Sequence, residues 1–162
     1  MKMVSVLLLN ILLGFVWVSM QEDFSPGQYL IGFGASFILL TLLSREYGRR
    51  VWASLDFIIF LLWSILKSSI QVAALILARR PALDQGIIAI PLDAQTDLEV
   101  SALATSITLT PGTLSIDTAR MPDGQAVLYV HSLTVGDPEA LRQEIKREFE
   151  QRILRVTRGG SQ

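Results

Sequence analysis

Residues 55–77, LDFIIFLLWSILKSSIQVAALIL, decide the fold of this chain. In a helical projection at about 100° per residue, six residues fall on one side: Asp56, Trp63, Ser64, Lys67, Ser68 and Gln71. Apolar side chains cover the rest of the circumference. A helix of this length, rising about 1.5 Å per residue, is roughly 35 Å long and reaches across a hydrocarbon core of about 30 Å.

Lys67 stands near the middle of this segment. A lysine at the centre of a membrane helix costs roughly 2.5–3.5 kcal/mol on an insertion scale. The segment also holds fourteen Leu, Ile, Phe and Val residues. Each of these contributes roughly 0.3–0.6 kcal/mol in the other direction, so that their sum, on the order of 6 kcal/mol, outweighs the lysine. Hydropathy therefore permits residues 55–77 to span a membrane.

The flanks of the segment favour a different placement. Arginines stand on both sides of it: Arg45, Arg49, Arg50, Arg79 and Arg80. Because basic residues concentrate on the cytoplasmic side of membranes, we expect both ends of the helix to lie inside. The prediction for residues 45–80 is a basic turn followed by a long amphipathic helix at the cytoplasmic membrane face, with its polar stripe against water or partner subunits. The alternative is a third span with Lys67 facing protein.

The composition divides the chain into two parts. It has 162 residues, 51% of them hydrophobic, and a net charge of −1. Residues 4–20 and 24–44 contain no charged side chain, whereas residues 81–162 carry eleven acidic and seven basic ones. This division predicts a membrane part and one small water-soluble domain. The absence of a basic stripe argues against nucleic acid as a partner, and the absence of cysteine excludes disulfides and thiol chemistry.

Two transmembrane helices are predicted within residues 1–44, at about 4–20 and 27–43. The turn between them is acidic and lacks basic residues, so we place it on the non-cytoplasmic side. Asn10 lies inside the first helix, where it bonds either across to another helix or to its own backbone. Gly32 and Ser36 form a pair of small residues that permits another helix to approach closely.

The sequence pattern of residues 81–162, the soluble part, predicts the element order β-α-β-β-α. The expected elements are a strand at 86–91, a helix at 96–109, strands at 113–118 and 126–131, and a helix from 137 onward. A βαβ crossover followed by a hairpin gives a three-stranded sheet with two helices on one face. The predicted fold class is therefore a membrane protein with α-helical transmembrane segments and a small α+β cytoplasmic domain of truncated ferredoxin-like type.

Several local signals refine this domain. Thr96 and Glu99 form a capping box at the start of the first helix. That helix is expected to turn Leu98, Leu103 and Ile107 inward. Alternation at residues 113–118 places Leu114 and Ile116 on one face of a half-buried strand. Asp137 and Pro138 begin the last helix, and its apolar stripe consists of Leu141, Ile145, Phe149, Ile153 and Val156.

The sequence contains no phosphate loop, dinucleotide fingerprint or nucleophile motif. His131 is the single histidine, and without cysteine it cannot form an ordinary zinc site. Lys67 and Asp56 are about three helical turns apart and make no proton relay. We therefore predict no catalytic, cofactor-binding or metal-binding residue and no cofactor. The residues expected to contact lipid or partner proteins are Lys67, Asp56, Asn10, Arg49 and Arg50.

Several stretches together resemble one known family. They are NILLGFVW (10–17), the basic and apolar segment 49–77, GIIAIPLD (86–93), TDLEVSALATSITLTPGTLSID (96–117), LYVHSL (128–133) and ILRVTR (153–158). They resemble the E subunit of the multisubunit Mrp-type cation/proton antiporter, also called Mnh, Pha or Sha. The likeness covers nearly the whole chain, and ITLTPGT followed by LYVH is its most specific part. That family commonly has asparagine where this chain has Thr105.

The resemblance implies an accessory subunit, not an enzyme, in a complex of the bacterial cytoplasmic membrane that exchanges Na⁺ for H⁺. In such complexes the large subunits are similar to the proton-pumping subunits of respiratory complex I and carry the ion path. The implied partners are the other antiporter subunits and the lipid bilayer. The alternatives are a free-standing membrane-tethered binding or sensor domain and, third, a small membrane enzyme.

Overall fold

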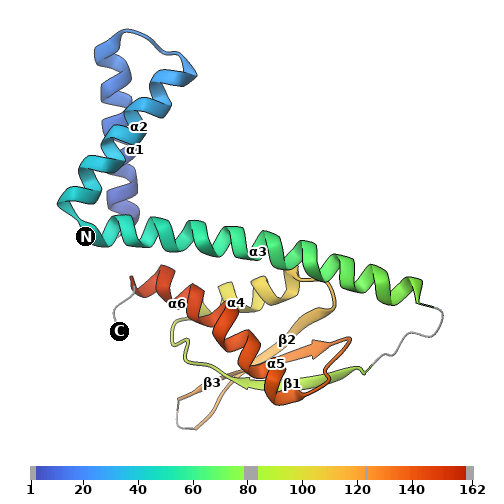
Figure 1. Ribbon diagram of the computed structural model, residues 1–162. Helices are drawn as coiled ribbons and strands as arrows, with labels where there is room; N and C mark the ends of the chain where they lie inside the picture. Colours follow the sequence, from blue (N-terminus) through green and yellow to red (C-terminus); the bar gives the residue numbers. More distant parts are fainter. Residues whose placement is uncertain (1–2, 79–83, 123, 160–162) are drawn as a thin grey trace. The chain divides into compact units, whose positions relative to one another are not determined.

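The computed structural model describes residues 3–78, 84–122 and 124–159 (Figure 1). Arg79 and Arg80, two of the predicted flanking arginines, lie outside the described residues. The chain forms two compact units, Met1–Trp52 and Ala53–Gln162. The boundary falls inside helix α3 (Arg45–Leu77), whose first turns belong to the first unit and whose remainder belongs to the second.

The first unit contains α1 (Met3–Gln21), α2 (Pro26–Leu43) and the start of α3. A Cβ atom added at Gly32 on α2 would lie 2.9 Å from the carbonyl oxygen of Gly14 on α1, closer than side chains pack. Ser36, one turn further along α2, is buried. The small pair predicted from the sequence is therefore used inside the chain's own helical hairpin.

Helix α3 begins at Arg45, so the basic segment expected as a turn forms its first turns. The Glu46 carboxylate accepts a hydrogen bond from Arg50 Nη2 at 2.5 Å, an i,i+4 pair that supports helix at this position. By length and composition, α2 and α3 are long and apolar enough to cross a membrane, and Ser5–Gln21 of α1 is a shorter apolar helix.

The second unit contains an antiparallel sheet of β1 (Gly86–Pro91), β2 (Thr113–Arg120) and β3 (Ala126–Ser132). The strand order is β1-β3-β2, and both outer strands pair antiparallel with β3. The strands β1 and β2 therefore run in the same direction on either side of β3. The pairing of β2 shifts register between Ser115 and Asp117.

Helix α4 (Asp97–Leu109) connects β1 to β2, and a terminal helix follows β3. This terminal helix consists of α5 (Pro138–Glu144), a π-helical segment η1 (Ile145–Glu150) and α6 (Gln151–Arg158). The predicted order β-α-β-β-α is thus confirmed. Pro111 ends α4, and Gly112 makes the turn into β2 with a φ of 96°, which other residues rarely adopt.

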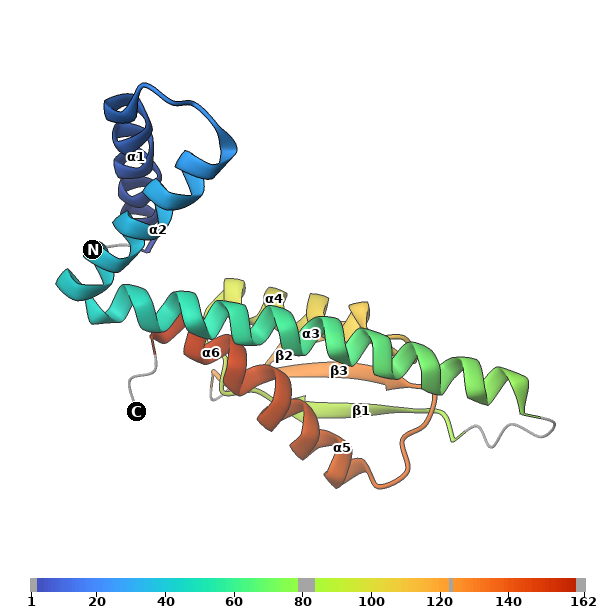
Figure 2. The ribbon, with the colours of Figure 1, turned by 45° about the horizontal axis from the view of Figure 1, so that its top comes forward.

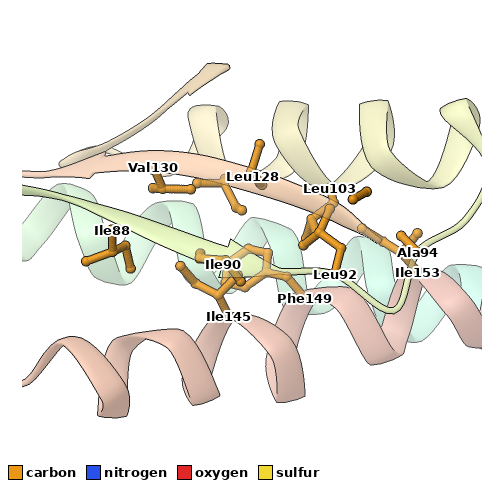
Figure 3. Close-up of a cluster of buried hydrophobic side chains, with 12 residues drawn as sticks. Ile88, Ile90, Leu92, Ala94, Leu103, Leu128, Val130, Ile145, Phe149 and Ile153 are labelled. Carbon is orange, nitrogen blue, oxygen red and sulfur yellow. The ribbon is translucent and has the colours of Figure 1, made fainter. Parts of the chain in front are cut away.

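The core lies between one face of the sheet and the two helices (Figure 3). Five side chains from the sheet contribute to it, namely Ile88, Ile90, Ala126, Leu128 and Val130. The helices contribute Leu103, Ile107, Ile145, Phe149 and Ile153, all buried. The inward positions predicted for Leu103 and Ile107 and most of the terminal apolar stripe are therefore confirmed.

One predicted inward position is wrong, and on one strand the shared apolar face is the exposed one. Leu98 is 72% exposed, because the inward position in the first turn of α4 belongs to Glu99, which is 2% exposed. On β2, Leu114 and Ile116 lie on the face of the sheet that no helix of the described domain covers, and both are about half exposed. Ser115 points to the helices instead, where its hydroxyl donates to the Ala104 carbonyl at 2.9 Å. A polar side chain thus faces the interior on each element, Glu99 on α4 and Ser115 on β2.

Candidate functional site

From Ala53 onward, α3 packs against the helical side of the α+β domain (Figure 2). The ring of Phe60 meets that of Phe149 edge to face, with 5.1 Å between the centroids. Phe57 and Leu61 also pack against the domain core. One face of α3 is therefore occupied by the chain's own domain.

Asp56, a predicted contact residue, belongs to this junction. Its Oδ2 lies 3.3 Å from Nε of Arg152 on α6, and the same guanidinium donates to Glu148 Oε2 at 2.7 Å. The guanidinium carbon of Arg152 also lies 4.1 Å from the centroid of the Phe60 ring. Arg152 thus combines two ion pairs with a cation–π contact. Because Asp56 and Arg152 are far apart in sequence, helical periodicity gave no signal for their ion pair.

Further along α3, a groove of about 780 Å³ separates the helix from the domain. One wall is the polar stripe of α3, with Ser64, Lys67, Ser68 and Gln71. The terminal helix supplies Glu144 and Glu148, and the turns after α4 and β3 supply the remaining wall. The polar stripe that we expected to meet water or partner subunits therefore lines a groove within its own unit.

Lys67 is exposed in this groove and forms no ion pair or hydrogen bond with the described residues. The Ser68 hydroxyl donates to the Ser64 carbonyl at 2.7 Å, which leaves its oxygen able to accept. No carboxylate in the described part of the domain lies within ion-pair distance of the lysine. The groove therefore presents a cationic donor opposite carboxylates.

The opposite face of α3 is apolar and exposed. Its large side chains are 51–84% exposed: Ile58, Ile59, Leu62, Leu66, Ile70, Ile76 and Leu77. Contiguous exposed apolar surface of this kind is typical of protein or membrane interaction sites. The helix is thus amphipathic, as the sequence predicts, but its polar side faces its own domain and not only water or partner subunits, as we expected.

Asn10 is fully buried in the first unit. Its Nδ2 donates to the hydroxyl of Tyr47 at 3.0 Å, so it bonds across to the first turns of α3 in the same chain. Its Oδ1 has no hydrogen-bond partner among the described residues. The two predicted arginines differ, since Arg49 is exposed and Arg50 is half-buried and paired with Glu46.

Glu99 is a buried carboxylate that the sequence placed only in a capping box. The box is present, since Glu99 N donates to the Thr96 hydroxyl and Thr96 N donates to Glu99 Oε2, both at 3.2 Å. The carboxylate also accepts two bonds from the Arg158 guanidinium, each 2.9 Å long, and one from Thr157. The Arg158 hydrogen bonds hold the pKa of Glu99 far below its ordinary value, against the opposing effect of burial.

Glu150 is a second buried carboxylate, 1% exposed, for which the sequence gave no signal. Its Oε1 accepts hydrogen bonds from the backbone N–H of Asp93 at 2.6 Å and of Ala94 at 2.9 Å. Its Oε2 has no hydrogen-bond partner in the described part of the chain. Burial raises the pKa of Glu150, although the two backbone bonds oppose that rise.

No group of three or more metal-ligating side chains occurs among the described residues. His131 is half-buried on β3, opposite Ile87 of β1 and Leu114 of β2. The geometry thus offers a helix docking site, a polar groove and an apolar helix face.

The sequence profile of a family described as "Na+/H+ ion antiporter subunit" matches residues 10–156. The chain belongs to this family. Two relatives support the assignment along nearly the full length of this antiporter subunit. The E subunit of the Na⁺/H⁺ antiporter of Alkalihalophilus pseudofirmus is 33% identical over 157 residues, which cover 94% of this chain and 98% of that protein. The corresponding E subunit of Bacillus subtilis is 29% identical, with the same coverage.

Two solved structures resemble this chain, and the first agrees with the family. A chain in the Mrp complex from Dietzia sp. has a TM-score of 0.51 and 27% identity, and the match covers 62% of this antiporter subunit and 91% of that chain. A chain in the membrane-bound sulfane sulfur reductase, an archaeal respiratory membrane complex, has a TM-score of 0.53 over 93% of this chain and 98% of its own. At 23% identity, that second likeness concerns the fold alone.

Proposed function

We propose that this chain is the E subunit of an Mrp-type Na⁺/H⁺ antiporter, an accessory component that supports assembly and activity without an ion path of its own. The observation that carries this proposal is the family match across residues 10–156, together with a relative 33% identical over 94% of the chain. Its partners are the other subunits of the complex and the bilayer. A free-standing tethered sensor domain is not favoured, because the relatives named above are antiporter subunits.

The proposal includes a membrane arrangement. Helices α1 and α2 span the bilayer, and α3 lies along its cytoplasmic face with its apolar side in the lipid. The packing of α3 on its own domain supports this arrangement. A spanning α3 would draw Asp56, Arg152 and Glu148 into hydrocarbon, where ionisable groups are costly. A surface-lying α3 leaves them at the aqueous side and buries only the apolar face.

The α+β domain is placed in the cytoplasm, and the arginines before α3 support that side. Its proposed type is ferredoxin-like without the last strand. The position of β3 between β1 and β2 supports this type, because a split βαβ unit leaves room for one strand between its two parallel strands.

Two experiments test these proposals. Affinity purification of the tagged full-length chain in mild detergent is expected to recover the large antiporter subunits, and recovery of the chain alone would refute the accessory role. For topology, the chain's lack of cysteine permits single replacements. We expect Gln21→Cys to react with an impermeant maleimide on intact cells and Gln143→Cys, on exposed α5, to react only after lysis. Labelling of Gln143→Cys on intact cells would place the domain outside.

A further inference from the structure

Two opposite charges in the groove beneath α3 lack partners among the described residues. Lys67 stands on one wall, and Glu144 on the facing terminal helix stands on another. Glu148 lines the same groove but already pairs with Arg152 at 2.7 Å. The groove is therefore arranged for a ligand that carries one anionic and one cationic group.

We propose that this groove binds the headgroup of a phospholipid with a primary ammonium, of the phosphoethanolamine class. The phosphate is held by Lys67 and the ammonium by Glu144. This inference rests on the proposed placement of α3 at the membrane surface, because that placement brings the groove to the depth of the headgroups.

The α3 wall suits a phosphate. Ser64, Lys67 and Gln71 are spaced three and four residues apart, so their side chains lie in one row along the helix. An ammonium, a hydroxyl and an amide together offer several N–H and O–H donors to phosphate oxygens. A charge-assisted bond from Lys67 is the strongest of these.

The rim of the groove favours a lipid over a peptide. Trp63 lines the groove and is 64% exposed, and an indole is well suited to the boundary between headgroups and acyl chains. Directly beside it, Ile59, Leu62 and Leu66 begin the exposed apolar face of α3. A headgroup in the groove thus has a continuous apolar surface along which its acyl chains leave. The groove volume of about 780 Å³ also falls within the range of small-molecule sites.

The test is native mass spectrometry of the full-length chain in detergent, with phosphatidylethanolamine, phosphatidylglycerol or phosphatidylcholine of identical acyl chains added. We expect phosphatidylethanolamine to be retained best. Lys67→Gln is expected to weaken retention of phosphatidylethanolamine and phosphatidylglycerol by about fivefold or more, because both use the phosphate contact. Glu144→Gln is expected to abolish the preference for phosphatidylethanolamine while leaving phosphatidylglycerol retention unchanged.

Charge-matched controls lie outside the groove. Lys146→Gln removes a positive charge from a residue that pairs with Asp93. Glu139→Gln removes a negative charge from a residue that pairs with Arg142. Both variants are expected to leave lipid retention unchanged. Equal retention of the three lipids, or the same retention in both groove variants as in the unmodified chain, would overturn the proposal. Binding of water-soluble glycerophosphoethanolamine as tightly as phosphatidylethanolamine would also overturn the proposal. Crosslinking of Ser64→Cys to a partner peptide in place of lipid would have the same consequence. The experiment measures lipid bound to the isolated chain. Its result therefore does not depend on whether antiporter subunits co-purify, which is the test of the accessory role.

Discussion

Arg152 on α6 holds its guanidinium carbon 4.1 Å from the ring centroid of Phe60 on α3. The same residue pairs with Asp56 one helical turn earlier on α3. One side chain therefore fixes the long amphipathic helix to the α+β domain by a cation–π contact and an ion pair. Arg152 therefore links the domain to the helix that is proposed to lie on the membrane.

Arg152→Lys is expected to destabilise the full-length chain even though it conserves the charge. Lysine lacks the planar guanidinium that lies over Phe60 while forming ion pairs with two carboxylates, so we expect a loss of about 1 kcal/mol. That loss corresponds to a fall in melting temperature of about 2–4 °C. Thermal unfolding in detergent measures it, with Arg155→Lys at an exposed position of the same helix as the matched control. Equal melting temperatures for the two variants would contradict the stacking role.

Glu99→Gln is expected to cost about 1.5–3 kcal/mol at neutral pH, because hydrogen bonds from Arg158 to a charged acceptor are lost. The pKa of Glu99 lies below its ordinary value in the folded chain. The stabilisation is therefore present above the unfolded pKa of about 4.5 and is lost as the pH falls below it. Melting temperatures between pH 3 and 7 measure this difference. Asp97→Asn, at an exposed ion pair in the same helical turn, is expected to have a much smaller effect.

Glu150 is expected to make stability change with pH in the direction opposite to Glu99. Burial raises its pKa, so the folded chain binds the proton more tightly than the unfolded chain. Stability then falls as the pH rises from about 4.5 through the raised pKa. Glu150→Gln keeps an oxygen for the Asp93 and Ala94 amides and removes the buried charge. We expect its melting temperature to rise relative to the unmodified chain as the pH increases, with Lys146 and Asp93 as the nearby charges.

The comparison between variant and unmodified chain cancels the contribution of Glu99, which both proteins share. Glu139→Gln, at an exposed residue of the same terminal helix, serves as the control and is expected to show no such pH-dependent difference. A difference between Glu150→Gln and the unmodified chain that stays constant with pH would mean that folding does not change the pKa of Glu150.

Much of the fold was predictable because its signals are local. The capping box at Thr96, the Asp137–Pro138 start and the turn at Gly112 each depend on a few neighbouring residues, and all three are present. The apolar run of α3 likewise predicted a long helix.

The wrong predictions concern side chains whose placement depends on partners distant in the sequence. Glu99 takes an inward position because Arg158, from the far end of the domain, satisfies its carboxylate. Leu98 is then left exposed. The polar stripe of α3 pointed to a partner, but periodicity alone did not indicate that this partner includes the chain's own domain. The pair of Asp56 and Arg152 depends on the same tertiary contact.

Lys67→Ala is expected to leave antiport intact while modestly reducing assembly. A transport path through a membrane needs a chain of ionisable groups, and α2 contains no charged residue that would continue one. Lys67 instead lines a groove beside the domain, and we expect its loss to affect lipid or subunit contacts there. Na⁺/H⁺ exchange in everted vesicles, normalised to the amount of assembled complex, measures the effect, with Lys146→Ala as the control. A fully assembled complex without exchange activity would show that Lys67 belongs to the ion path.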